Sequence, residues 1–137
     1  MSGTDSKPIV LVVDDEATIR QAIGRIQGRA GYTHFEASDP NSALGLADLY
    51  QFSLVLCDIN MPGGSGLDML RSIRRRHPGI AVVMVTGIDN RGAESMAAEF
   101  GAFGYVTKPF ESGELLDTVA KALKRREATL GNGAARR

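Results

Sequence analysis

Acidic side chains directly follow short apolar runs at two places in this sequence. Asp14 and Asp15 end the run "VLVV" (10–13), and Asp58 ends the run "LVLC" (54–57). At about 4 Å in an effective dielectric of about 20, each pair of carboxylates would repel by roughly 4 kcal/mol. If the three acids converge, they therefore need a cation. Hard oxygen ligands favour Mg²⁺, with Mn²⁺ as the alternative, over zinc, which prefers nitrogen or sulfur.

Two more polar residues follow apolar runs farther along the chain. Thr86 comes after "AVVMV" (81–85), and Lys108 comes after "GYVT" (104–107). A metal beside one carboxylate, with a lysine and a hydroxyl opposite, suits a phosphoryl group, because a carboxylate can attack phosphorus and form an aspartyl phosphate. The metal and Lys108 would neutralise charge on the transferred oxygens, and Thr86 would donate a hydrogen bond to one of them. Each residue alone is also typical of a solvated loop or a strand end, so the prediction depends on their joint placement.

The elements that would bring these residues together alternate regularly between strands and helices. Apolar runs predict five strands, at residues 9–13, 33–37, 54–57, 81–85 and 104–107. Apolar residues three and four apart, with capping signals, predict helices near residues 19–30, 40–49, 67–76, 92–100 and 112–126. Five strand–helix units predict an α/β fold with a doubly wound five-stranded parallel sheet, covered by helices on both faces.

The carboxyl ends of parallel strands share one edge of the sheet, and ligands bind at that edge where the strand order reverses. Four of the five predicted strands end in the polar residues named above. The second strand ends in Glu36-Ala37-Ser38, with nothing comparable. A strand order of 2-1-3-4-5 places the first and third strands side by side and the second strand outside, and we therefore predict that order.

Length and composition limit the class of protein. The 137 residues predict one domain at 9–126, a flexible N-terminus at 1–8, and a disordered tail or linker stub at 127–137. Sixteen basic and sixteen acidic residues balance, so no direct contact with nucleic acid or with membranes is expected. The single Cys57 cannot form an internal disulfide and fits a reducing compartment, and no apolar run reaches the roughly 20 residues of a membrane span. These features predict a cytoplasmic protein.

Four segments resemble the receiver domain of two-component response regulators, the CheY-like superfamily. They are "LVVDDE" (11–16), "LCDINMPGGSG" (56–66), "VTG" (85–87) and "YVTKPF" (105–110), in the order and spacing of that family. The resemblance covers about residues 8–126. It implies the flavodoxin-like three-layer sandwich of receivers. It also implies a magnesium-dependent phosphoacceptor switch in a bacterial two-component phosphorelay, rather than an enzyme.

The resemblance assigns roles within the acidic site. It implies that Asp58 is the phosphoacceptor and also contributes to the metal site. Asp15 would ligate Mg²⁺ directly, and Asp14 would do so mainly through water. Asn60 would offer its backbone carbonyl to the metal, and Lys108 would pair with a phosphoryl oxygen.

The resemblance also implies a switch pair and a particular backbone geometry. Thr86 would move toward the phosphoryl group while the ring of Tyr105 turns inward. The Lys108–Pro109 peptide bond is expected to be cis, a form that is accessible only before proline. Ile88, two positions after Thr86, cannot orient an attacking water, so slow loss of the phosphoryl group is expected.

The same resemblance implies the partners. A sensor histidine kinase or a phosphotransfer protein would supply the phosphoryl group, docking near the first helix. A downstream target protein or an output domain would contact the face of the fourth helix, fifth strand and fifth helix. Residues 127–137 are too few and too polar to build a DNA-binding module, so the sequence leaves open a single-domain regulator or part of a longer protein. It also leaves open whether phosphorylation drives homodimerisation.

Three other functions compete with this interpretation. An aspartyl-phosphate hydrolase of the haloacid dehalogenase type needs a second acid two residues after its nucleophile, where this chain has Asn60. A flavodoxin-like flavin carrier needs a Ser-, Thr- and Gly-rich phosphate loop after its first strand, where this chain has Asp14, Asp15 and Glu16, which repel phosphate. A non-phosphorylated pseudo-receiver docking module would have lost site residues that this chain retains.

Overall fold

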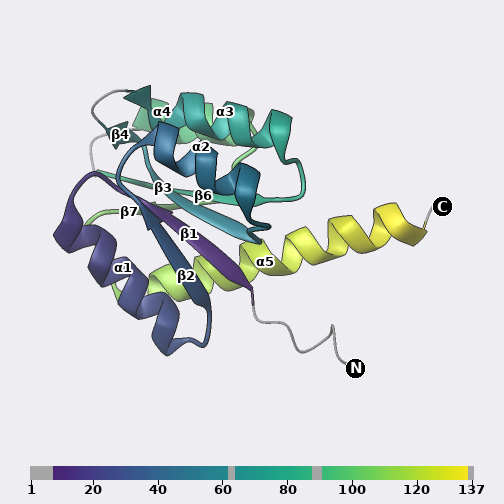
Figure 1. Ribbon diagram of the computed structural model, residues 1–137, viewed down its shortest axis with the longest axis horizontal. Coiled ribbons are helices and arrows are strands. Elements are labelled where there is room, and N and C mark those ends of the chain that lie inside the picture. Colours follow the sequence, from purple (N-terminus) through teal and green to yellow (C-terminus); the bar gives the residue numbers. More distant parts are fainter. Residues whose placement is uncertain (1–7, 62–63, 88–90, 136–137) are drawn as a thin grey trace.

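A computed structural model describes residues 8–61, 64–87 and 91–135 (Figure 1). The described residues form the strands β1 (Ile9–Val13), β2 (Thr33–Ala37), β3 (Leu54–Asp58), β4 (Asn60–Met61), β5 (Gly64–Ser65), β6 (Ala81–Thr86) and β7 (Gly104–Thr107). They also form the helices α1 (Ala17–Arg29), α2 (Pro40–Leu49), α3 (Gly66–Arg76), α4 (Arg91–Glu99) and α5 (Ser112–Ala135). Within these residues, no helix combines the length and the apolar composition that a membrane crossing requires.

The main sheet has five parallel strands in the order β2-β1-β3-β6-β7. These are the five predicted strands, so the predicted order 2-1-3-4-5 is confirmed. Strands β3 and β6 are one residue longer than predicted, because Asp58 and Thr86 still pair with Val85 and Thr107 of the neighbouring strands. A short antiparallel hairpin of β4 and β5 follows β3, and the sequence does not predict it. Its two-residue strands are too short to leave a periodic pattern.

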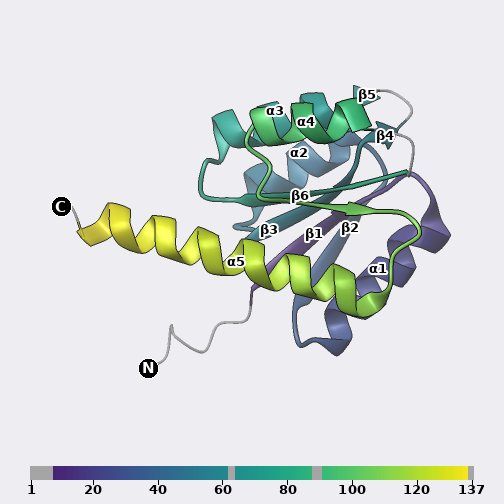
Figure 2. The ribbon, with the colours of Figure 1, turned by 180° about the vertical axis from the view of Figure 1, so that it is seen from behind.

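Helices cover both faces of the sheet and enclose two separate cores (Figures 1 and 2). Alternate residues of a strand point to opposite faces. Leu11 and Val13 of β1 pack into the core under α2, α3 and α4. Val10 and Val12 of the same strand pack into the core under α1 and α5. The central strands are continuously apolar because they have a helix layer on each side.

Helix boundaries follow local signals in the sequence. The Asp39 carboxylate accepts a hydrogen bond from the backbone N–H of Ser42 at 2.8 Å and caps α2, with Pro40 as the first helical residue, as predicted. That hydrogen bond is the main reason that the pKa of Asp39 lies below its ordinary value. Gly31 and Gly101 have φ angles of 92° and 98° just beyond α1 and α4, a conformation that favours glycine at helix ends.

The C-terminal end of the chain differs from the prediction. Residues 127–135, predicted as a disordered tail or linker stub, continue α5, which projects beyond the body of the domain (Figure 1). Arg126 Nε donates a hydrogen bond to the Gly79 carbonyl at 2.6 Å, and the side chain of Leu130 lies close to the same glycine. Extending an existing helix costs far less than starting one, so polar composition alone was misleading here. Residues 1–7 of the predicted flexible N-terminus lie outside the described residues.

Candidate functional site

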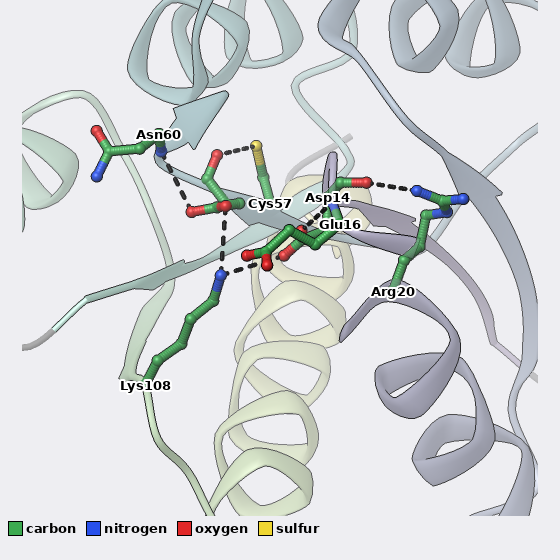
Figure 3. Close-up of polar contacts among 7 residues, drawn as sticks. Asp14, Glu16, Arg20, Cys57, Asn60 and Lys108 are labelled. Atoms are coloured by element: carbon green, nitrogen blue, oxygen red, sulfur yellow. Dashed lines mark hydrogen bonds and ion pairs between the residues drawn. The ribbon is translucent and has the colours of Figure 1, made fainter. Parts of the chain in front are cut away.

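The polar residues predicted from the sequence meet at the C-terminal edge of the main sheet. Val13 of β1 lies opposite Cys57 of β3, so the residues that come next, Asp14 and Asp58, are neighbours at this edge. Lys108 follows the edge strand β7, and its side chain reaches toward both carboxylates (Figure 3). It is 94 residues from Asp14 and 50 residues from Asp58 along the chain, so the strand order is what brings the three together.

Three carboxylates form a compact cluster. One oxygen each from Asp14, Asp15 and Asp58 lies within 4.8 Å of the other two. Asp14 is 1% exposed and Asp58 is 6% exposed, whereas Asp15 faces solvent. Three negative carboxylates and the one positive ammonium of Lys108 leave a formal charge of −2, which a divalent cation would balance. An all-oxygen donor set that opens to solvent suits Mg²⁺, which keeps several of its waters, so the residues present fit the predicted ion.

Lys108 bridges the two buried carboxylates. Its Nζ lies 3.3 Å from Asp14 Oδ2 and 3.3 Å from Asp58 Oδ2. Burial lowers the pKa of Lys108, but attraction to Asp58 and Asp14 outweighs burial, so the pKa of this ammonium is raised. The lysine is therefore a fixed positive charge in the site.

The Asp58 carboxylate is held at both oxygens. Its Oδ1 accepts a hydrogen bond from the backbone N–H of Asn60 at 3.2 Å, and its Oδ2 faces Lys108. Burial raises the pKa of Asp58 above its ordinary value, and the opposing effects of Lys108 and the Asn60 N–H do not cancel it. The fold thus keeps an incompletely neutralised carboxylate at the sheet edge, where further positive charge would stabilise it.

The predicted switch residues lie on the adjacent strands β6 and β7. Thr86 is fully buried, and its carbonyl accepts a hydrogen bond from the backbone N–H of Lys108 at 2.6 Å. Tyr105 pairs with Met84 of β6, is half-buried, and packs against the core on the α4 side of the sheet. Thr86 therefore lies two residues beyond the register partner of Tyr105, and the switching role of the pair stays a prediction.

The remaining site predictions differ in outcome. The Lys108–Pro109 peptide bond is cis, as the resemblance implied. Asn60 is exposed in β4 and lies beside Asp58, but the role of its carbonyl as a metal ligand stays a prediction. Ile88 lies outside the described residues, and its expected effect on loss of the phosphoryl group also stays a prediction.

Sequence reasoning missed two residues that shape this site. Gly66 opens α3 against the backbone of Asp58, where an added Cβ would lie 2.1 Å from the Asp58 carbonyl oxygen. Arg20 of α1 donates a hydrogen bond to the backbone carbonyl of Asp14 at 2.8 Å. A glycine in a glycine-rich loop and an arginine on an amphipathic helix are both ordinary, so only the tertiary contact distinguishes them.

The sequence and the fold of this chain are similar to those of known proteins. A family model described as "Response regulator receiver domain" matches residues 10–120. The response regulator protein PilR of Pseudomonas aeruginosa is 36% identical over 121 residues, which cover 88% of this chain and 27% of PilR. The chemotaxis protein CheY of the same species is 36% identical over 119 residues, which cover 85% of this chain and 96% of CheY. A crystal structure of a CheY-like receiver domain protein from Methanospirillum hungatei JF-1 has a TM-score of 0.86 and 27% identity, and it covers 90% of this chain and 99% of that one. This chain thus spans only about a quarter of the length of PilR.

Proposed function

The chain belongs to the response regulator receiver domain family, and we propose that it is a magnesium-dependent phosphoacceptor switch. Asp58 takes a phosphoryl group from a sensor histidine kinase or a phosphotransfer protein. One observation carries this proposal: carboxylate oxygens of Asp14, Asp15 and Asp58 cluster within 4.8 Å, and Lys108 bridges two of the three acids. A docking module without chemistry has no need for three mutually repelling acids, two of them buried.

The phosphoryl transfer forms one bond and breaks one. A carboxylate oxygen of Asp58 attacks the phosphorus of a phosphohistidine, and the O–P bond forms as the P–N bond breaks. The electron pair of the P–N bond stays on the imidazole nitrogen, which solvent then protonates. Asp14, Asp15 and Asp58 would hold Mg²⁺, which would neutralise charge at the transferred oxygens. Lys108 adds a fixed positive charge that is in place before the reaction begins.

Phosphorylation changes the charge beside two groups that can respond to it. The new phosphoryl oxygens accept hydrogen bonds from Lys108 and from the hydroxyl of Thr86, which biases an existing equilibrium between inactive and active conformations. Both residues adjoin β6 and β7, so the change is transmitted to the face formed by α4, β7 and α5, where Tyr105 lies. A downstream target protein, an output domain or a second phosphorylated copy binds that face.

Incubation with acetyl phosphate and Mg²⁺ tests the proposed function. The intact mass of the protein is expected to rise by one phosphoryl group, and hydroxylamine, which cleaves acyl phosphates, is expected to reverse the gain. EDTA should prevent it. An unchanged mass in the presence of Mg²⁺, for a protein whose circular dichroism shows the native fold, would contradict the proposal and favour the non-phosphorylated docking module.

Replacing Lys108 by methionine is expected to separate metal binding from phosphoryl transfer. The variant keeps most of the side-chain length but removes a positive charge 3.3 Å from each of two carboxylates. Mg²⁺ should bind about tenfold more tightly, because it no longer competes with the ammonium group. Phosphoryl uptake should slow by about 10²–10³-fold, because charge on the transferred oxygens loses a partner.

Calorimetric titration with Mg²⁺ and timed mass spectra measure these two effects of Lys108→Met. Lys121→Met is the matched control, because Lys121 is an exposed lysine of α5, and it should change neither quantity. Weaker Mg²⁺ binding together with slower uptake would contradict the competition described above and would make Lys108 a structural support of the cluster.

A further inference from the structure

We infer that Arg20 is a positioning residue for the acidic cluster. It fixes the peptide plane between Asp14 and Asp15 and thereby sets the direction of the Asp15 carboxylate. The inference rests on the proposed function, in which these two acids hold Mg²⁺. Arg20 lies in the first turn of α1, its side chain is 16% exposed, and among the described residues it forms no hydrogen bond or ion pair with Asp58 or Lys108.

The guanidinium of Arg20 joins two elements at the end of the sheet. Its Nη1 donates a hydrogen bond to the carbonyl oxygen of Asp14 at 2.8 Å (Figure 3). Its Nε donates a hydrogen bond to Glu36 Oε1 of β2 at 3.1 Å. A planar guanidinium can hold two acceptors at once in fixed directions, which a lysine ammonium on a flexible chain cannot do. The turn between β1 and α1 is therefore fastened to β2 through one side chain.

The bond to Asp14 matters because of what shares its peptide unit. The carbonyl of Asp14 and the amide of Asp15 belong to one rigid plane, so a bond that holds the carbonyl also holds the start of Asp15. The Asp14 carboxylate has its own supports, since the backbone N–H of Glu16 and the ammonium of Lys108 donate to its two oxygens. Asp15 is exposed, and no described residue donates a hydrogen bond to its carboxylate. Its direction therefore depends on the backbone that Arg20 holds.

Glu36 is the second partner of the Arg20 guanidinium. It pairs in register with Val12, two residues before Asp14, so its carboxylate lies beside the end of β1. The ion pair with Glu36 neutralises the charge of Arg20, and an isolated arginine at this place would repel Mg²⁺. Arg20, paired with Glu36, thus donates a hydrogen bond to the Asp14 carbonyl while adding little net positive charge beside the acidic cluster.

Substituting Arg20 distinguishes a positioning role from an electrostatic role, because the two roles would change the Mg²⁺ affinity in opposite directions. Arg20→Met removes a positive charge near three acids, so a purely electrostatic role would tighten Mg²⁺ binding, whereas a positioning role weakens it. We expect the Mg²⁺ affinity to fall about tenfold, as is typical when a residue that orients metal ligands is lost. Arg20→Lys keeps the charge without the planar fork and should give an intermediate affinity. Arg25→Met is the matched control, because Arg25 is an exposed arginine of the same helix, and it should bind Mg²⁺ like the wild type.

Mg²⁺ titrations followed by calorimetry and by the amide NMR signal of Asp15 give the result, with thermal unfolding measured in parallel. A merely structural role would lower stability and leave the affinity unchanged. Unchanged or tighter Mg²⁺ binding by both Arg20 variants would therefore overturn the inference while leaving the proposed function intact. A wild-type protein that binds no Mg²⁺ would overturn the proposed function and the inference together, so the wild-type titration tells the two failures apart.

Discussion

Replacing Asp58 by asparagine is expected to abolish phosphoryl uptake and to raise the stability of the ion-free protein. Uptake fails because a neutral amide is too weak a nucleophile to form the acyl phosphate. Stability rises because Lys108 lies 3.3 Å from both Asp14 and Asp58 and cannot neutralise two buried carboxylates at once. With Asp58 neutral, Lys108 and Asp14 form one balanced pair, and we expect a gain of about 1–2 kcal/mol.

The charge of Asp58 also gives this gain a pH dependence with a defined sign. Burial raises the folded-state pKa of Asp58 above its unfolded value, so the folded protein takes up this proton first as the pH falls. Protonation of Asp58 therefore stabilises the folded wild-type protein. This contribution is complete below the unfolded-state pKa of Asp58 and is lost as the pH rises through its folded-state pKa. The stability difference between Asp58→Asn and the wild type should therefore widen from acidic to neutral pH. Mg²⁺ should narrow it by stabilising the wild type.

Intact mass after acetyl phosphate treatment and urea unfolding in EDTA measure the two effects of Asp58→Asn. Asp117→Asn is the matched control, because Asp117 is an exposed acid of α5. It should leave phosphoryl uptake unchanged and alter stability by less than about 0.5 kcal/mol. Full phosphoryl uptake by Asp58→Asn would mean that another residue is the acceptor. A variant less stable than the wild type would mean that the fold already compensates the charge of Asp58.

Replacing Gly66 by alanine is expected to destabilise the protein by about 3 kcal/mol or more and to impair phosphoryl uptake. The added Cβ would lie 2.1 Å from the carbonyl oxygen of Asp58 and 2.8 Å from Cα of Ile59. Both are backbone atoms, which cannot turn aside as the end of a long side chain can. The start of α3 must then move, which strains the 2.8 Å hydrogen bond from the Gly66 N–H to the Ile59 carbonyl and shifts the strand end that carries the acceptor.

Gly45→Ala provides the matched control for this effect. Gly45 lies within α2, is exposed, and has open space around the added Cβ. Alanine at such a helix position should stabilise the protein by about 0.5–1 kcal/mol. Urea unfolding of both variants compares them directly. A Gly66→Ala protein as stable as the wild type would mean that α3 can move away from Asp58 without cost.

Much of the fold could be predicted because each element leaves a local pattern. Strands covered on both faces must be apolar throughout, and this requirement marks β1, β3 and β6 without any tertiary information. The continuation of α5 through residues 127–135 could not be predicted in this way. Its composition resembles a linker, and the neighbours of this part of the helix, such as Gly79 near Leu130, lie about fifty residues away along the chain.

The sequence predicted which residues form the site better than it predicted how they are arranged. Polar residues at strand ends, combined with one strand order, bring Asp14, Asp58 and Lys108 to the same edge. The equal distances from Lys108 to the two carboxylates, and the close approach of Gly66 to Asp58, depend on how side chains and backbones pack in three dimensions. The contact of Arg20 could not be predicted either, because its partner is the backbone carbonyl of Asp14 and every residue carries such a carbonyl.

The reach of Lys108 has a consequence for protein synthesis and quality control. Its two carboxylate partners lie 94 and 50 residues earlier in the chain, at the ends of the central strands β1 and β3, while Lys108 follows β7, the last of the described strands in chain order. A nascent or partly folded chain can present the acidic residues but not the lysine that completes their surroundings. On the proposed function, we expect full reactivity of Asp58 toward its phosphoryl donor only after β7 has joined the sheet, so an incompletely folded copy would accept the phosphoryl group slowly.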